Sequence, residues 1–489
     1  MVLIRAPMAT PIPQNSAPFT VEEIARVTGG RVVRTGPDAR GVSTDSRSIP
    51  EGAAFVALTG ESFDGHAFLP QAALRGAAVF VLSRDVPLPD RGAVVLVDDG
   101  LAALGALARA HRARWAERPH PLGPRALVGI GGSAGKTTTT RVTAALLAGA
   151  GRGDVHATAG NLNNAIGVPM TLLGLEDRHR FAVVEIGTNQ RGEVASLARI
   201  ARPDVAVVTS IGVEHTEGLG TLEDVANEEG DLFAALPAEG VAVGNADDEH
   251  VAAQMGRAGS QRRAGYGRSE AAAYRITARR AEGLRGSAVR IERGGEAIEV
   301  SVPLLGEAGA LAAAAGIAAV EELLGERLRG DAATRALSVM TLPSDGRLSA
   351  AELPDGTVIL DDSYNANPVS MRSSLRTAAE LAASLGKRLV LALGEMRELG
   401  ALSAAEHDAL GEQAAAARPA ALIAVGGDAA RTARAAEAAG VTAWFAATSE
   451  EAATRALEVV RAGDLVLVKG SRGIRMERIA EALARRGAR

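Results

Sequence analysis

The segment Gly131-Gly132-Ser133-Ala134-Gly135-Lys136-Thr137 combines the residue types that bind phosphate. Small residues let backbone N–H groups approach phosphate oxygens, and the start of a helix adds partial positive charge. Lys136 would reach the β- and γ-phosphates of ATP, and the hydroxyl of Thr137 would bind Mg²⁺. We therefore expect an ATP site here. The alternative is a glycine-rich turn that carries a surface lysine.

Lysine is rare in this chain, which makes the position of Lys136 informative. The 489 residues include three lysines, Lys136, Lys387 and Lys469, against 50 arginines. A lysine at the position that a phosphate loop requires argues against the surface-lysine alternative. No motif around Lys387 explains its presence.

Composition excludes several other classes of protein. Acidic residues outnumber basic ones by 58 to 53, and a formal net charge of −5 excludes a polycation that coats nucleic acid. Without cysteine there is no disulfide, thiolate nucleophile or cysteine-based metal centre. Pro7, Pro11 and Pro13 interrupt the apolar N-terminus, and no apolar run approaches the roughly 20 residues of a membrane span. We expect a cytoplasmic protein without stable membrane insertion or a nucleic-acid partner.

Short apolar segments alternate with alanine-rich helical segments, which predicts an α/β protein of three domains. Residues 18–115 contain four strand-like segments, and prolines between 116 and 126 indicate a linker. Residues 125–340 contain the phosphate loop, apolar strands typical of a parallel sheet and a more polar strand-like segment at 275–302. Residues 341–489, after a boundary near 342–346, alternate strands and helices as in a doubly wound, Rossmann-like sheet.

Several motifs resemble the Mur ligase and folylpolyglutamate synthase superfamily. The phosphate loop has three residues, not the usual four, between Gly131 and the Gly-Lys pair, as in the short GxxGKTTT loop of that superfamily. The other matching segments are VSTDSRSIPEGAAFVALTGESFDGHAF (42–68), GNLNNAIGVPMTLLGL (160–175), the stretch from VVEIG to EGLG (183–220), DDSYNANPVSM (361–371), LGEMRELG (393–400) and KGSRGIRME (469–477). DDSYNANP and GEMxELG are particular to the branch that adds D-alanyl-D-alanine.

The resemblance implies an ATP-dependent ligase of peptidoglycan precursor synthesis. Family members activate a carboxylate with ATP to an acyl phosphate, which an amine attacks to give an amide, ADP and phosphate; metal ions offset the charge that develops. The implied architecture is an N-terminal uridine-nucleotide domain, a central P-loop ATPase domain and a C-terminal Rossmann-like domain that closes over the junction. The implied cofactors are ATP and Mg²⁺, and the implied partners of a monomer are UDP-N-acetylmuramoyl-tripeptide and D-alanyl-D-alanine.

The family's site residues, carried over position by position, fall in all three domains. Catalytic roles fall to Lys136, Glu185, His215, Glu229, Arg347 and Lys469. Nucleotide binding falls to Gly132, Ser133, Ala134, Gly135, Lys136, Thr137, Thr138, Arg347, Asp362 and Asn365. Substrate binding falls to Thr44, Asp45, Ser46, Arg47, Asn163, Asn164, Asn367 and Ser471, and metal binding to Thr137, Glu185, His215 and Glu229. Glu395 would orient its loop.

Several of these assignments have an ordinary structural alternative. The alternatives are a solvated strand end for Glu185, a cap for His215, loop capping for Asn163 and Asn164, a surface position for Arg347 and a turn for Thr44–Arg47. Glu185 and His215 follow consecutive apolar strands, where parallel sheets bind ligands, and this placement favours the functional interpretation.

The chain departs from the family at the second metal site. Where the family carries a carbamylated lysine, this chain carries Glu229. A carbamate and a carboxylate both offer an anionic pair of oxygens to a metal ion. Our hypothesis is that Glu229, with or without Glu228, binds the second Mg²⁺ without carbon dioxide. The alternative is a solvated acid on a helix face.

A second departure lies where the family contacts adenine. The family's G-R-H-N-x-x-N run is Gly306-Glu307-Ala308-Gly309-Ala310-Leu311-Ala312 here, without its histidine and asparagines. The departures leave two alternatives to a D-alanyl-D-alanine-adding enzyme. One is a related ligase for another carboxylate and amine, and the other is a nucleotide-binding protein without catalysis, against which the retained lysines and metal-binding residues argue.

Overall fold

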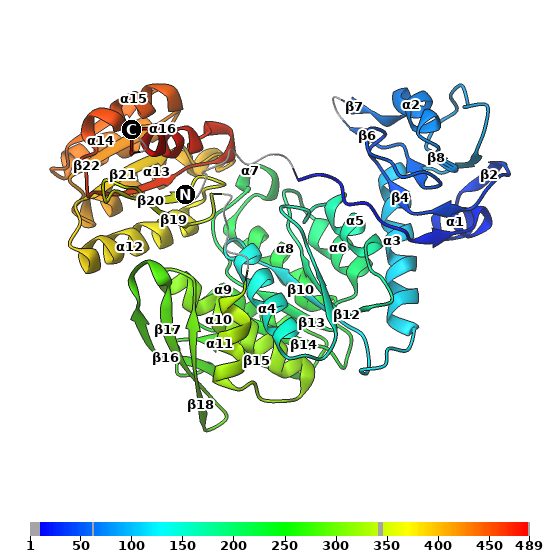
Figure 1. Cartoon of the computed structure of the whole chain (residues 1–489), viewed down its shortest axis with the longest axis horizontal. Coiled ribbons are helices and arrows are strands. Elements are labelled where there is room, and N and C mark those ends of the chain that lie inside the picture. The colour runs from blue at the N-terminus through cyan, green and yellow to red at the C-terminus, as the bar shows by residue number, and fades with distance from the viewer. Residues whose placement is uncertain (1–9, 61–62, 341–345, 488–489) are drawn as a thin grey trace.

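The computed structural model describes residues 10–60, 63–340 and 346–487, which form three lobes, each built on one large sheet (Figure 1). Pro7 lies outside the described residues, as does the predicted second domain boundary near 342–346 except for Gly346. The α/β class is confirmed, while the predicted domain bounds of 18–115, 125–340 and 341–489 stay predictions. Within the described residues, no helix is both long enough and apolar enough to cross a membrane.

The N-terminal lobe is a five-stranded sheet in the order β2-β9-β8-β5-β4, parallel except for β2. Its strands are β2 (Arg31–Arg34), β4 (Val42–Ser43), β5 (Ala54–Val56), β8 (Val79–Leu82) and β9 (Ala93–Leu96). Two-stranded ribbons pair β1 (Pro18–Phe19) with β3 (Ala39–Arg40) and β6 (Thr59–Gly60) with β7 (Phe63–Asp64). The helices are α1 (Val21–Thr28), α2 (Leu69–Leu74) and α3 (Gly100–Glu117). The four predicted strand-like segments are confirmed.

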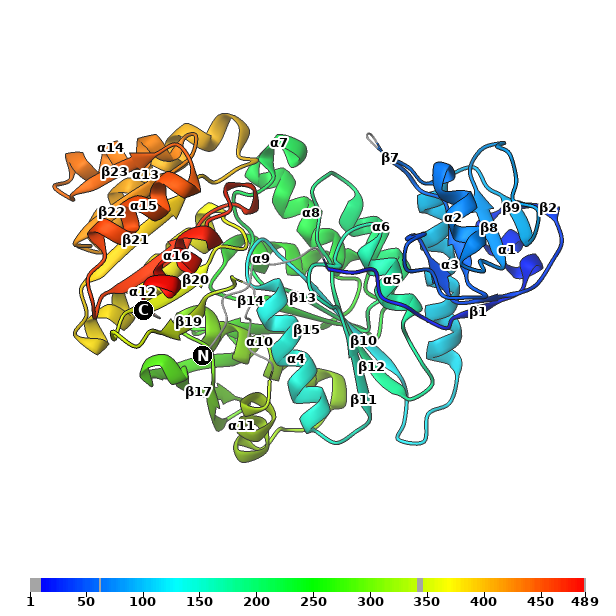
Figure 2. The same cartoon turned by 45° about the horizontal axis from the view of Figure 1, so that its top comes forward.

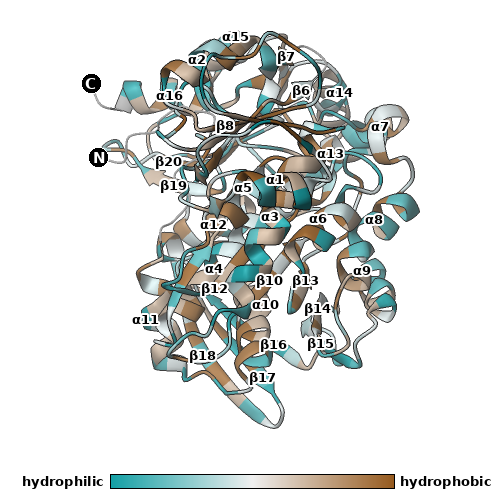
Figure 3. Cartoon of the chain, turned by 90° about the vertical axis from the view of Figure 1, so that its right-hand side faces the viewer, coloured by the Kyte–Doolittle hydropathy of each residue, from teal (hydrophilic) through white to brown (hydrophobic). Residues whose placement is uncertain are grey.

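The central lobe has a nine-stranded sheet in the order β11-β12-β10-β13-β14-β15-β16-β17-β18. Its strands are β10 (Ala126–Gly131), β11 (Asp154–Ala157), β12 (His179–Glu185), β13 (Val205–Val208), β14 (Val241–Asn245), β15 (Arg262–Gly267), β16 (Tyr274–Ala281), β17 (Ser287–Arg293) and β18 (Glu296–Val302). β10 to β15 run parallel, and β10, β12, β13 and β14 are buried along almost their whole length, so helices must cover both faces. β17 and β18 alternate buried and exposed residues and extend from the lobe in mixed teal and brown (Figure 3).

Helices cover both faces of the central sheet. One face carries α4 (Lys136–Gly149), α10 (Gly306–Leu324) and α11 (Gly330–Ser338), and the other carries α5 (Gly167–Leu173), α6 (Glu193–Ala201) and α8 (Leu222–Ala234). The alanine-rich segment is α10, which packs closely on α4, because a Cβ at Gly316 would lie 2.6 Å from Val142. The short helices α7 (Thr216–Leu219) and α9 (Glu249–Gln254) follow the carboxyl ends of β13 and β14.

The C-terminal lobe is a doubly wound sheet, as predicted, in the order β19-β20-β24-β21-β22-β23. Its strands are β19 (Ser349–Glu352), β20 (Val358–Asp362), β21 (Leu389–Gly394), β22 (Ala421–Val425), β23 (Ala443–Ala446) and β24 (Leu465–Lys469). α12 (Pro368–Leu385), α13 (Ser403–Ala416) and α14 (Ala429–Ala438) cover one face, and α15 (Ser449–Val459) and α16 (Glu477–Gly487) cover the other. This lobe meets the central lobe beside α7 (Figure 2).

Candidate active site

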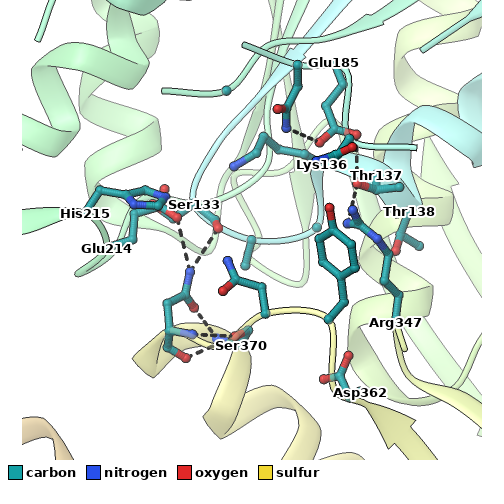
Figure 4. A pocket seen from close by; sticks show the side chains of 18 of the residues that line it. Ser133, Lys136, Thr137, Thr138, Glu185, Glu214, His215, Arg347, Asp362 and Ser370 are labelled. Carbon is teal, nitrogen blue, oxygen red and sulfur yellow. Dashed lines mark hydrogen bonds between the residues drawn. The ribbon is translucent and has the colours of Figure 1, made fainter. Parts of the chain in front are cut away.

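A cavity of about 360 Å³ lies between the carboxyl ends of the central strands and the C-terminal lobe (Figure 4). Fifteen of the predicted site residues line it: Ser133, Ala134, Gly135, Lys136, Thr137, Thr138, Asn163, Asn164, Glu185, His215, Arg347, Asp362, Asn365, Asn367 and Lys469. They come from loops that are far apart in the sequence but adjacent because parallel strands end at one edge.

The phosphate loop links β10 to α4 in a conformation that requires glycine at two positions. Gly132 has φ of 115° and Gly135 has φ of 92°, and a Cβ at Gly132 would lie 2.3 Å from the hydroxyl oxygen of Thr209. α4 begins at Lys136, so its first amide groups face the cavity where an anion would bind. The Lys136 amine donates to the carbonyl of Gly132.

Carboxylates surround the amine of Lys136. Burial opposes its charge, but Glu214, Glu229 and Glu185 together raise the pKa of Lys136 above its usual value. The amine is therefore charged at neutral pH and suited to pair with phosphate oxygens.

Glu185, Thr137 and Arg347 form a chain of contacts across the two lobes. The Thr137 hydroxyl donates to Glu185 over 2.8 Å and accepts from Nη1 of Arg347 over 2.6 Å (Figure 4). The other carboxylate oxygen of Glu185 accepts from the side chain of Asn163 over 2.8 Å. The solvated and surface alternatives therefore do not describe Glu185, which is 2% exposed, or Arg347.

Glu229 lies beneath the phosphate loop and does not line the cavity. It is fully buried, and its Oε2 accepts from the amide of Gly132 over 2.7 Å, while no described residue hydrogen-bonds to its Oε1. Burial raises the pKa of Glu229 to about 7, although Lys136 favours the charged form. The solvated-acid alternative is wrong. Glu228 instead accepts from the amides of Gly192 and Val194 at the start of α6.

His215 lines the cavity but bonds away from the other predicted metal ligands. Its backbone is left-handed, with φ of 48°, and its Nδ1 contacts Glu398 of the C-terminal lobe. Thr216 donates to the carbonyl of Leu399 over 2.9 Å beside this contact. Across the described residues, no three histidine, aspartate or glutamate side chains already enclose a metal position.

The C-terminal lobe contacts the phosphate loop directly through Asn367, whose side-chain nitrogen donates to the carbonyl of Ser133 over 3.1 Å and to Glu214 over 3.2 Å. Lys469, 2% exposed, donates to Asp362 over 2.6 Å and to the carbonyl of Asn365 over 3.0 Å. Lys469 therefore fixes the loop that carries the nucleotide-binding candidates.

Other candidates have structural contacts. Asn164 caps the first amides of α5, as its alternative interpretation predicted, and also lines the cavity. Ser471 is buried and accepts from the amide of Arg397 outside the cavity lining. Thr44–Arg47 lie in the N-terminal lobe, away from the cavity, where Asp45 pairs with Arg47. Glu395 accepts from the amide of Asp428 over 3.1 Å.

At the segment that departs from the family, Ala308 lines the cavity and Glu307 joins an ion-pair cluster. Glu307 pairs with Arg268 over 2.6 Å and with Arg279 over 3.2 Å, and Arg279 also contacts Glu380 of α12. The position thus contributes to the junction between two lobes.

Glu214 and Tyr364 are two of the cavity-lining residues that the sequence did not predict. Glu214 immediately precedes His215 and is 5% exposed, and its negative charge helps to raise the pKa of Lys136. Tyr364 lies inside the DDSYNANP motif, with the guanidinium of Arg347 3.9 Å above its ring. Both stand next to predicted residues, so their positions in the two motifs were the available signal.

Family models match most of the chain. The Mur ligase family catalytic domain matches residues 38–112, the Mur ligase middle domain matches 130–320, and the glutamate ligase domain matches 346–472.

Individual proteins match over nearly the full length. The UDP-N-acetylmuramoyl-tripeptide--D-alanyl-D-alanine ligase of Escherichia coli is 35% identical over 96% of this chain and 99% of its own. A crystal structure of MurF from Acinetobacter baumannii, 28% identical, has a TM-score of 0.83 over 96% of this chain and 99% of its own. MurF from Thermotoga maritima in complex with ADP, 26% identical, has a TM-score of 0.78 over 91% and 97%.

Proposed function

The chain belongs to the Mur ligase family, and on that premise we propose that it is an ATP-dependent ligase that joins D-alanyl-D-alanine to UDP-N-acetylmuramoyl-tripeptide. The observation that carries the proposal is the cavity in which the phosphate loop faces Arg347, Asp362 and Lys469. In the reaction, the γ-phosphoryl group is transferred from ATP to the substrate carboxylate, which gives an acyl phosphate and ADP. The amine of the dipeptide then attacks the acyl carbon, forms the amide and displaces phosphate. We also propose that the enzyme is a monomer and acts in the cytoplasm.

The phosphate loop would bind the triphosphate through the amides at the start of α4 and the amine of Lys136. Arg347 would stabilise charge on the transferred group from the opposite side, because it already contacts Thr137 across the cavity. Lys136→Ala should lower turnover at least a hundredfold, while Lys136→Arg should not restore it, because a guanidinium does not fit the place of a compact ammonium.

The residues around Thr137 fit a magnesium ion. The Thr137 hydroxyl and the Glu185 carboxylate lie 2.8 Å apart and form the all-oxygen donor set that Mg²⁺ prefers with phosphate oxygens, and Asn163 donates to the other carboxylate oxygen of Glu185. Bound there, Mg²⁺ would offset the negative charge of the phosphates. Thr137 and Glu185 would hold it, and Asn163 would orient Glu185.

We propose that His215 and Glu229 bind a second metal ion. These two side chains are less well arranged for a metal ion than Thr137 and Glu185 are. Glu229 has an unpartnered buried oxygen, which suits a metal ligand, but His215 is held by Glu398. The two side chains would come together only when nucleotide is bound.

For the substrates, we propose that Asn163, Asn164 and Asn367 contact the reacting groups, since all three line the cavity. Thr44–Arg47 would hold the uridine diphosphate part in the N-terminal lobe. Asp362 and Asn365 would contact the nucleotide, and Lys469 and Ser471 would position their loops.

The function is tested by incubating the protein with ATP, Mg²⁺, UDP-N-acetylmuramoyl-tripeptide and D-alanyl-D-alanine. We expect ADP, phosphate and a product whose mass equals that of the UDP-linked pentapeptide. Release of ADP without that product would favour a ligase for another carboxylate and amine. No ATP turnover with any acceptor would favour a non-catalytic nucleotide-binding protein.

The role of Glu229 is tested by its dependence on carbon dioxide. Turnover of the native protein should not change when bicarbonate is removed, and Glu229→Gln should lower it about 10- to 100-fold. Glu229→Lys restores the family residue and should make turnover rise with added bicarbonate. Unchanged turnover of Glu229→Gln at ordinary Mg²⁺ would contradict the hypothesis. Glu228→Gln is the neighbouring control, because Glu228 contacts α6 instead.

A further inference from the structure

Tyr364 follows β20 and lines the cavity, although neither sequence reasoning nor the proposed function gave it a role. We propose that Tyr364 is a positioning residue that aims the guanidinium of Arg347 at the transferred phosphoryl group. The inference rests on the proposed function for the identity of the reaction, whereas the contacts that support it belong to the protein alone.

Two guanidinium groups lie over the aromatic ring of Tyr364. The central carbon of Arg347 lies 3.9 Å from the ring centroid, and that of Arg472, in the turn Arg472–Ile474 after β24, lies 5.3 Å from it. A cation within about 6 Å of an aromatic centroid is attracted by the electron-rich face of the ring. The distance to Arg347 is the shortest among such contacts of the described residues. The ring therefore restrains a side chain that otherwise has several rotatable bonds.

The backbone around Arg347 is tied to the same turn. The amide of Tyr364 donates to the carbonyl of Gly346 over 2.8 Å. Gly346 has φ of 72° and Leu348 has φ of 54°, so left-handed residues flank Arg347 on both sides. A Cβ at Gly346 would lie 2.7 Å from the hydroxyl oxygen of Ser363. Tyr364 thus holds the backbone before Arg347 through its amide and the guanidinium of Arg347 through its ring.

The far end of Arg347 reaches the phosphate site. Its Nη1 donates to the hydroxyl of Thr137 over 2.6 Å, at the first turn of α4. A guanidinium held beforehand at this place stabilises developing phosphoryl charge without further reorganisation. The Tyr364 hydroxyl makes no hydrogen bond with any described residue, so the ring and not the hydroxyl carries the role.

The test compares side chains that keep or remove the ring. Tyr364→Phe should retain turnover within about twofold, while Tyr364→Leu and Tyr364→Met should lower kcat about tenfold with KM for ATP nearly unchanged. Affinity for ADP alone should be unchanged in all variants. Affinity for ADP with aluminium fluoride and Mg²⁺, which mimics the phosphoryl group in transfer, should fall about tenfold in the two ringless variants. Two apolar replacements guard against a folding defect in one of them, and thermal unfolding monitors both.

A double variant separates positioning from a general structural role. In the Arg347→Ala background, loss of the ring should have no further effect on kcat or on aluminium fluoride binding. The proposal is overturned if the ringless variants keep native values, if they lose ADP affinity equally, or if their effect adds to that of Arg347→Ala. Should the native protein make no pentapeptide, the proposed function fails, while the aluminium fluoride measurements still decide the role of Tyr364.

Discussion

The two junctions of the central lobe are built from different kinds of contact. Towards the N-terminal lobe, one continuous hydrophobic cluster includes Leu107 and Trp115 of α3 together with Leu172 of α5 and Leu197 of α6. Towards the C-terminal lobe, the apolar residues Val213, Leu284 and Leu305 are only partly buried against the C-terminal core. Polar contacts bridge the rest of this junction: Asn367 to Ser133, Arg347 to Thr137, and Thr216 to the carbonyl of Leu399.

Because of this difference, we expect the N-terminal and C-terminal lobes to differ in how easily they move relative to the central lobe. Separating the N-terminal junction would expose apolar surface at a cost that grows with area. The polar contacts at the other junction can be exchanged for water or for nucleotide, because hydrogen bonds contribute only about 0.5–1.5 kcal/mol net each. We therefore expect any domain opening to involve the C-terminal lobe, next to the cavity.

The largest effect should come from removing Trp115 at the apolar junction. Trp115 is 2% exposed, and its indole nitrogen donates to the carbonyl of His179 over 3.0 Å. Trp115→Ala should lower the free energy of unfolding by about 3–5 kcal/mol, measured by urea denaturation. The other tryptophan, Trp444, is only partly buried, and Trp444→Ala is the control with a smaller loss. If both variants lost the same free energy of unfolding, the special role of Trp115 at the apolar junction would be contradicted.

At the polar junction, Arg347→Ala should affect catalysis and spare stability. Because the guanidinium faces the phosphate site, kcat should fall about a hundredfold, equivalent to roughly 3 kcal/mol of transition-state stabilisation. The free energy of unfolding should change by less than about 1 kcal/mol. Arg372→Ala, on an arginine that contacts Glu406 at 3.8 Å on the C-terminal lobe, should leave both quantities unchanged.

The apolar junction should also respond to acid. Burial, with the neighbouring ring of His156, lowers the pKa of His179 to about 4. The unfolded chain takes up this proton near pH 6.5 and the folded protein only near 4, so stability falls as pH drops through that window, by on the order of 2 kcal/mol. His179→Asn, which retains an acceptor for the amide of Glu176, should flatten this part of the profile in urea titrations. An unchanged slope would refute the assignment.

The smallest effect on stability is expected for Glu398→Ala. Its loss frees His215 and should shift the C-terminal lobe towards open arrangements, while the free energy of unfolding changes by less than about 1 kcal/mol. Because the chain has no cysteine, one introduced on each lobe can carry a dye pair, and energy transfer should decrease. The same variant with dyes on the N-terminal and central lobes should show no change.

Local patterns predicted much of the fold and site. The phosphate loop, the strands and their parallel arrangement depend on neighbouring residues, and Lys136, Thr137 and Glu185 meet as the sequence suggested. Contacts across long separations could not be predicted. The pairing of His215 with Glu398, 183 residues away, and the burial of Glu229 under Gly132 depend on how the lobes and helices pack. The amine of Lys387 donates to the carbonyl of Gly356 over 2.6 Å, a contact that no local motif indicates.

The three lysines also determine how the protein can be modified chemically. None is exposed, and each amine already donates to a protein oxygen: Lys136 to Gly132, Lys387 to Gly356, and Lys469 to Asp362. Reagents that acylate amines should therefore find no readily accessible side chain, and two of the three targets become reachable only through the cavity. The rate of lysine acylation thus becomes a direct gauge of how often the C-terminal lobe opens, and bound nucleotide should slow it at Lys136 and Lys469 but not at Lys387.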